Sequence, residues 1–136
     1  MRQAPAGRYE LVFLQRFDWD SEDGKCHICF RVSEMLNAIA EGKLRYEEVR
    51  SPLDVVFARN WVSKRDIRLN RIMAMTTTEL NSPVLGVWMP DGSVLLVDGS
   101  HRYMARYRLH RDYIDWHLIA LGDWQAYATI TGELKP

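Results

Sequence analysis

The chain has 136 residues, which matches the usual length of one domain, so we expect residues 1–136 to form a single small domain. Hydrophobic residues make up 47% of the chain, and its five Trp, six Tyr and four Phe exclude disorder over most of its length, because these side chains need a core. Lys and Arg number 18, as do Asp and Glu, so the formal net charge is zero and gives no global attraction to nucleic acid.

Residues 1–8 at the N-terminus predict a loose leader. They contain no apolar stretch of the kind that signal peptides carry. No run in the chain approaches the roughly 20 apolar residues of a membrane helix. We therefore expect a cytoplasmic protein that does not bind a membrane.

Two strands are predicted near the N-terminus. Residues 9–14 are apolar and β-prone, which predicts the first strand. Residues 18–24 are polar and acidic and end in Gly, which is typical of a turn. Residues 25–32 alternate loosely between apolar and polar types, so we expect them to return as the second strand.

A helix is predicted after these strands, over residues 34–40. Ser33 stands before it as a candidate N-cap, and Gly42 follows as a stop signal. Further on, Pro52 after Ser51 predicts the first turn of another helix, which would begin at Leu53.

The middle of the chain predicts a β-hairpin. Residues 72–75 predict a short strand and residues 76–83 a polar connection. Residues 84–89 predict a strand, and Pro90-Asp91-Gly92 predicts a tight turn, because Pro presets its first corner and Gly accepts a positive φ. Residues 93–97 are apolar on both faces, which predicts a central strand.

The last third of the chain predicts a helix, a strand and an arm. Residues 101–109 have helical spacing, and residues 113–120 are β-prone. Residues 122–136 are polar and aromatic, and we expect them to pack as a short arm. The side chains of Trp88, Trp116 and Trp124 are more typical of a core than of platforms for stacked bases.

The segment Asp98-Gly99-Ser100-His101-Arg102 joins a predicted strand to a predicted helix. A helix N-terminus exposes unpaired N–H groups and a partial positive charge, so it stabilises an anion. Gly99 lets a ligand approach the backbone, while Ser100, His101 and Arg102 add donors. From residue 98 to residue 111 there are four Arg and one Asp, a local excess of positive charge. We therefore predict a phosphate site at Gly99, Ser100, His101 and Arg102.

This turn, the hairpin before it and the strand after it resemble the ParB/sulfiredoxin superfamily over residues 72–121. Residues 1–71 show no such resemblance. The resemblance implies a small α/β (α+β) domain with a mixed sheet, in which the turn binds nucleotide phosphates. It also implies that Asp98 stands at the start of the turn and that Asp98 and His101 are candidate catalytic residues.

Two departures from the family narrow the expected activity. Sulfiredoxins carry a reactive Cys immediately before the His-Arg pair, where this chain has Ser100, so sulfinic acid reduction is not expected. Few residues follow the last predicted strand, so we do not expect the DNA-binding and dimerisation domains of a partition protein. The free-serine kinases of the superfamily resemble the turn most closely, and for their upstream carboxylate the candidates are Asp66 and Glu79.

The leading hypothesis is binding of a nucleotide (ATP, ADP or CTP) with Mg²⁺, with phosphoryl transfer or nucleotide hydrolysis as the class of reaction if the chain is an enzyme. One alternative is a nucleic-acid-binding or nuclease-like regulatory module. The other is an inert adaptor for protein interactions. The nucleic-acid alternative rests on a basic patch formed by Arg65, Arg68, Arg71 and Arg106.

The segment Cys26-His27-Ile28-Cys29 has the spacing of half a zinc site. A structural zinc usually needs a second such pair, and the chain has only these two Cys. Alternation of the two thiols along a strand is the favoured interpretation. We therefore predict no metal ion and two free thiols.

Overall fold

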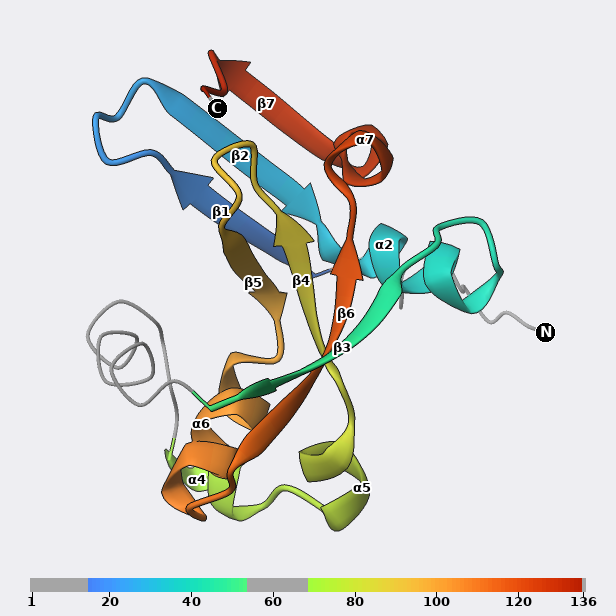
Figure 1. The fold of residues 1–136 in the computed structure, drawn as a ribbon, viewed down its shortest axis with the longest axis vertical. Coiled ribbons are helices and arrows are strands. Elements are labelled where there is room, and N and C mark those ends of the chain that lie inside the picture. The colour runs from blue at the N-terminus through green and yellow to red at the C-terminus, as the bar shows by residue number, and fades with distance from the viewer. Residues whose placement is uncertain (1–14, 54–68, 136) are drawn as a thin grey trace, which may run out of the picture.

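The computed structural model describes residues 15–53 and 69–135, which form a small α+β fold with a three-stranded and a four-stranded sheet (Figure 1). The strands are β1 (Arg16–Asp20), β2 (Cys26–Arg31), β3 (Glu47–Pro52), β4 (Val84–Trp88), β5 (Val94–Asp98), β6 (Tyr113–Ile119) and β7 (Ala128–Gly132). The helices are α2 (Val32–Ala40), α4 (Leu69–Met73), α5 (Thr77–Asn81), α6 (Ser100–Arg108) and α7 (Leu121–Trp124), with a short 3₁₀ turn, η1 (Gln125–Tyr127). Among these helices none is long and apolar enough to span a bilayer.

The three-stranded sheet has the order β1–β2–β7, and both pairings are antiparallel. The strand predicted over 25–32 is confirmed as β2, whereas the one predicted over 9–14 lies outside the described residues. The predicted turn at 18–24 is too long, because Asp18 and Asp20 belong to β1 and lie on its exposed face. Acidic residues on the outer face of an edge strand therefore produced a sequence that is typical of a turn.

The helix predicted over 34–40 is confirmed as α2, but it begins directly after β2, at Val32. Ser33 is inside the helix and is not its N-cap. Its Oγ accepts a hydrogen bond from the Gln15 N–H at 2.7 Å, so it links α2 to the start of β1. The glycine stop is confirmed, since Gly42 has a φ of +75°.

The four-stranded sheet has the order β3–β6–β4–β5 and is mixed, because β4 and β6 run parallel and the other pairs antiparallel. The strands predicted over 84–89, 93–97 and 113–120 are confirmed. The strand β5 is an edge strand, however, and not a central one. Leu96 packs in one core while Val97 packs in the other, so this edge strand is apolar on both faces.

Two predictions for the connections of this sheet are wrong, and a third is not tested. Ser51 and Pro52 are the last residues of β3, and the helix expected from Leu53 onward lies outside the described residues. Residues 72–75 are not a strand, since α4 reaches Met73. The predicted polar connection contains α5, which Thr76 caps by accepting a hydrogen bond from the Glu79 N–H at 3.1 Å. A Thr followed three residues later by Glu is a capping signal, and the run of β-branched residues obscured it.

Apolar clusters occupy both faces of the four-stranded sheet. One lies between the two sheets and includes Phe30, Val87 and Trp124. The other lies beneath α6 and includes Tyr103 and Trp116. Trp116 and Trp124 are buried, as predicted, while Trp88 remains 36% exposed. The expected C-terminal arm contributes a further strand, since β7 completes the three-stranded sheet.

Candidate functional site

The predicted strand-glycine-helix turn is present where β5 leads into α6. Gly99 has a φ of +107°, a conformation that side chains with a Cβ rarely adopt. A Cβ at this position would lie 2.6 Å from Cγ1 of Val84, so there is no space for one either. Both the conformation and the packing therefore require glycine at the bend that starts α6.

Asp98 and Arg102 stabilise this bend through their own contacts. The Arg102 guanidinium donates to the Pro83 carbonyl at 2.8 Å and to the Asp98 carboxylate at 3.1 Å. The other carboxylate oxygen of Asp98 accepts from the Gln15 side-chain amide at 2.9 Å. Both side chains are thus bonded to protein groups that hold the turn in place.

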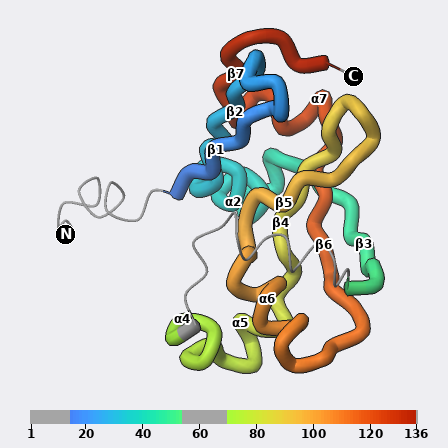
Figure 2. The backbone as a smooth tube through the Cα atoms, turned by 90° about the vertical axis from the view of Figure 1, so that its left-hand side faces the viewer, coloured from blue at the N-terminus to red at the C-terminus, as the bar shows by residue number. Residues whose placement is uncertain are grey.

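A cavity of about 700 Å³ lies beside the turn and is called the α6 pocket below. The residues predicted to bind phosphate all line it, together with residues of β1, α4 and α5. Figure 2 shows β1 above this region and α4 and α5 below it, on the side where β5 enters α6. The lining comprises Gln15, Arg16, Phe17, Arg71, Met75, Glu79, Ser82, Val97, Asp98, Gly99, Ser100, His101 and Arg102.

Two further arginines bring positive charge to the α6 pocket. Arg16 comes from β1 and Arg71 from α4, and both are exposed. Within residues 15–53 and 69–135, neither guanidinium has an ion pair. Glu79 lines the same pocket from α5, and one of its carboxylate oxygens lies 3.3 Å from the Thr76 hydroxyl that caps the helix. Arg16 was missed from the sequence because only the folded sheet brings it to the turn.

The N-terminus of α6 adds a partial positive charge at the same place. The helix has nine residues, and Ser100, His101 and Arg102 form its first turn. The aligned peptide dipoles place about half an elementary charge at such an end. Arg16, Arg71 and the helix end therefore favour an anionic group in the α6 pocket, against the carboxylate of Glu79, which pairs with no arginine of the described residues.

The basic patch predicted from the sequence is not assembled as expected. Arg106 is only 6% exposed, and its guanidinium donates to the Leu80 and Tyr113 carbonyls, each at 3.0 Å. Burial lowers the pKa of Arg106 from its ordinary value. Arg71 lies in the α6 pocket, while Arg65, Arg68 and Asp66 lie outside the described residues.

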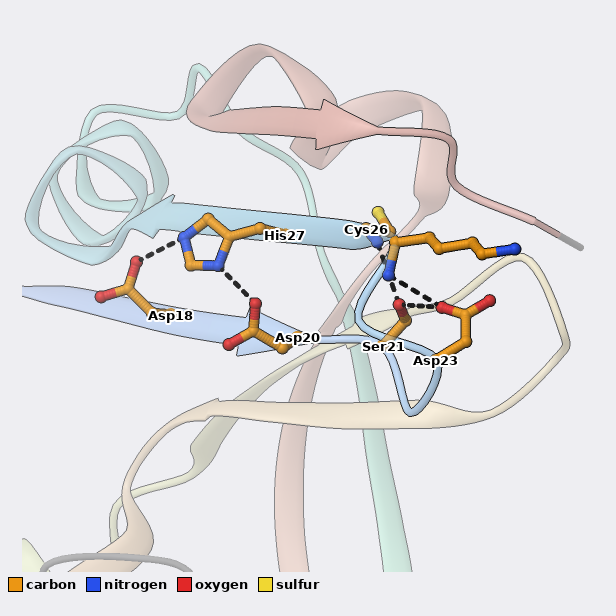
Figure 3. Close-up of polar contacts among 7 residues, drawn as sticks. Asp18, Asp20, Ser21, Asp23, Cys26 and His27 are labelled. Atoms are coloured by element: carbon orange, nitrogen blue, oxygen red, sulfur yellow. Dashed lines mark hydrogen bonds and ion pairs between the residues drawn. The ribbon is translucent and has the colours of Figure 1, made fainter.

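The two cysteines of β2 are free thiols that point to opposite faces of the three-stranded sheet. Cys26 is buried in the core, whereas Cys29 lies on the outer face, so they cannot share a metal ion. Burial raises the pKa of both thiols. His27 bonds to Asp20 at 2.8 Å and to Asp18 at 3.2 Å, which occupies both ring nitrogens (Figure 3). No metal-ligating group of three occurs among the described residues.

Comparison with family models, with curated proteins and with solved structures yields no match for this chain. The resemblance to the ParB/sulfiredoxin superfamily therefore stays a prediction. The geometry and charge of the α6 pocket are the features that bear on function.

Proposed function

We propose that this protein binds a phosphate-bearing ligand, and specifically a nucleotide, in the α6 pocket, and that its fold is ParB/sulfiredoxin-like. The observation that carries the proposal is one cavity lined both by the glycine turn and by two arginines from separate elements that form no ion pair with any described residue. Helix ends that follow a glycine bend hold phosphate through backbone N–H groups. Arginine holds phosphate through paired hydrogen bonds from its planar guanidinium.

In this proposal one part of the pocket binds the anionic phosphate, and another part offers apolar surface. The backbone from Gly99 to Arg102 and the His101 side chain face the phosphate, with Arg16 and Arg71 as its charged partners. Phe17, Met75 and Val97 supply apolar surface in the same cavity. A nucleotide combines a charged end with a flat base, so it matches both parts. Asp98 and Arg102 act indirectly, by holding the turn.

Mg²⁺ fits this pocket only when it binds together with the phosphate groups of the ligand. Protein sites for Mg²⁺ usually combine one or two carboxylates with phosphate oxygens of the substrate. Of the described residues that line the pocket, Glu79 carries a carboxylate that pairs with no described arginine, and this part of the chain holds no cage of three ligands. When bound, Mg²⁺ neutralises charge that develops on a phosphoryl group.

A thermal-shift and calorimetry series tests the proposal. ATP, ADP, CTP, inorganic phosphate and adenosine are each titrated with and without Mg²⁺. A ligand that binds the native state raises the melting temperature, and we expect this of the phosphate-bearing ligands but not of adenosine.

Variants then locate the site. Arg16→Gln and Arg71→Gln are each expected to weaken nucleotide binding about tenfold, the effect of one lost charge-assisted contact. Arg108→Gln is the matched control, since Arg108 is an exposed arginine in the last turn of α6. Equal binding of adenosine and ADP, or equal losses in all three variants, would contradict the proposal.

A further inference from the structure

A second cavity, of about 390 Å³, lies where three chain segments meet, and is called the three-turn cavity below. The segments are the β1–β2 turn, the β4–β5 turn and the residues after β7. Figure 1 shows all three in the upper part of the molecule, away from α6. The described residues that line this cavity are all different from those that line the α6 pocket.

The floor of the three-turn cavity is apolar. Trp19 from β1 and Leu95 from β5 are half-buried, and Leu134 approaches from the C-terminal segment. Trp19, Leu95 and Leu134 all pack against the core between the two sheets. The cavity has the size of a small-molecule site, and its floor offers the apolar surface that such sites use to hold a ligand.

The rim carries the opposite charge to the α6 pocket. Among the described residues that line it, Glu22, Asp23, Asp91 and Glu133 carry carboxylates, and Lys135 is the one cation. The chain as a whole has no net charge, so this acidic excess is a property of the cavity. Charge of one sign at the mouth of a low-dielectric cavity attracts ligands of the other sign.

Two of these carboxylates are held in place by their own turns. Asp23 accepts from the Ser21 hydroxyl at 2.7 Å and from the Lys25 N–H at 3.0 Å (Figure 3). Asp91 accepts from the Ser93 N–H at 2.9 Å and from the Ser93 hydroxyl. In both cases Oδ1 makes these bonds, and among the described residues no bond to Oδ2 occurs. These hydrogen bonds lower the pKa of both carboxyl groups, which therefore stay ionised.

We propose that the three-turn cavity binds a small organic cation with an apolar body, an aryl- or alkylamine, independently of the α6 pocket. The apolar body lies on the floor, and the ammonium group faces the carboxylates of the rim. The indole of Trp19 adds a favourable surface for a cation. An anion is repelled by the rim. A bare metal ion lacks a set of three ligands among the described residues.

Three probes with the same phenylethyl body test the charge requirement. They are phenethylamine, 2-phenylethanol and 3-phenylpropionate, titrated into the ¹⁵N-labelled protein at pH 7. Binding is followed by the indole N–H signal of Trp19, assigned by its loss in Trp19→Phe. We expect saturable binding of the amine, binding of the alcohol weaker by about fivefold, and no binding of the carboxylate.

A double variant tests the rim. Glu22→Gln with Glu133→Gln removes two charges from exposed side chains that make no ion pair with the described residues. We expect it to weaken amine binding about fivefold and to leave alcohol binding unchanged. Glu47→Gln, on the exposed part of β3, is the matched control.

Three results would overturn the proposal. The first is equal affinity for the amine and the alcohol, which would show that the cavity binds apolar groups without selecting for positive charge. The second is unchanged amine affinity in the double variant. The third is an unmoved Trp19 signal at about 10 mM phenethylamine, a concentration at which a ligand of this size binds a formed site.

Discussion

The α6 pocket and the three-turn cavity belong to one neutral chain and have opposite charge. The α6 pocket gathers Arg16 and Arg71 around a helix N-terminus, whereas the rim of the three-turn cavity carries four carboxylates and one lysine. A net charge of zero therefore describes neither region. Fields at a binding site depend on the few charges that line it, so local arrangement decides what each region attracts.

The two regions also differ in how their charges are fixed. At the α6 pocket, Arg102 and Asp98 neutralise each other and shape the backbone, so the attracting charges come from other elements. At the three-turn cavity, Asp23 and Asp91 shape their own turns and still present charge at the rim. Tertiary assembly consequently forms both cavities, but it also supplies the attracting charges of the α6 pocket, whereas local turn chemistry holds Asp23 and Asp91 at the three-turn cavity.

Gly99→Ala is the change with the largest expected effect on this comparison. It places a Cβ against Val84 and forces alanine into a positive φ, so we expect a loss of about 3 kcal/mol in the free energy of unfolding, measured by urea titration. Nucleotide binding should be lost too, while phenethylamine binding should persist. Gly92→Ala is the matched control: Gly92 has a φ of +86° in open space, and we expect about 1 kcal/mol. Equal losses would show that packing against Val84 does not matter.

Arg106→Met separates structural arginines from ligand-binding ones. The substitution removes the donor of the buried bond to the Leu80 carbonyl and of the partly buried bond to the Tyr113 carbonyl, and we expect a loss of about 2 kcal/mol in the free energy of unfolding. Arg71→Gln should change stability by less than about 0.5 kcal/mol, because Arg71 is exposed. Comparable destabilisation by the two variants would remove the distinction between them.

Salt should weaken the binding of the two charged ligands, ADP and phenethylamine, and leave the binding of the neutral probe, 2-phenylethanol, unchanged. Raising the ionic strength from about 0.05 M to about 0.5 M screens charges at exposed rims. We expect a severalfold loss of affinity for ADP at the α6 pocket and for phenethylamine at the three-turn cavity, measured by calorimetry. The affinity for 2-phenylethanol should stay constant. An amine affinity that does not respond to salt would mean that the acidic rim contributes nothing.

The sequence predicts the elements whose signals are local. The hairpin over residues 84–97 and the bend at Gly99 depend on short-range preferences, and both are confirmed. The edge position of β5 could not be predicted, because apolar residues on both faces show that a strand is buried but do not show how many strands pair with it. β5 is at the edge because β4 pairs on its other side with β6, in parallel, and this pairing has no signal in the sequence of β5.

The candidate site was predictable only in part for the same reason. Gly99 carries a conformational signal within a strand-to-helix connection, so the position of the turn follows from the sequence. Arg16 has no motif around it and joins the α6 pocket from a different sheet. Arg106 was predicted in a basic patch, yet its long side chain bonds to the carbonyls of Leu80 and Tyr113, which only the folded chain places there.

The smallest expected effect is the pH dependence of stability that comes from two histidines. His27 lies in the three-stranded sheet and His117 in the four-stranded one, so the two can be compared within one molecule. The hydrogen bond to Asp20, with the nearby charge of Asp18, raises the pKa of His27, whereas burial lowers the pKa of His117. NMR titration should therefore find the two values on opposite sides of about 6.5, the value of an unperturbed histidine.

The sign of the effect on stability follows from these directions. A raised pKa in the folded state means that protonated His27 stabilises the protein fully below about pH 6.5, and that this contribution is lost as the pH rises through the folded pKa. A lowered pKa in the folded state means that the contribution of neutral His117 to stability is complete above about pH 6.5 and is lost as the pH falls through the folded pKa. In urea titrations at about pH 6 and pH 8, the wild-type protein should gain less stability on going to pH 8 than His27→Gln does. His117→Gln should shift the difference in the opposite direction. A pH dependence that His27→Gln leaves unchanged would show that the bonds to Asp18 and Asp20 do not favour the charged ring.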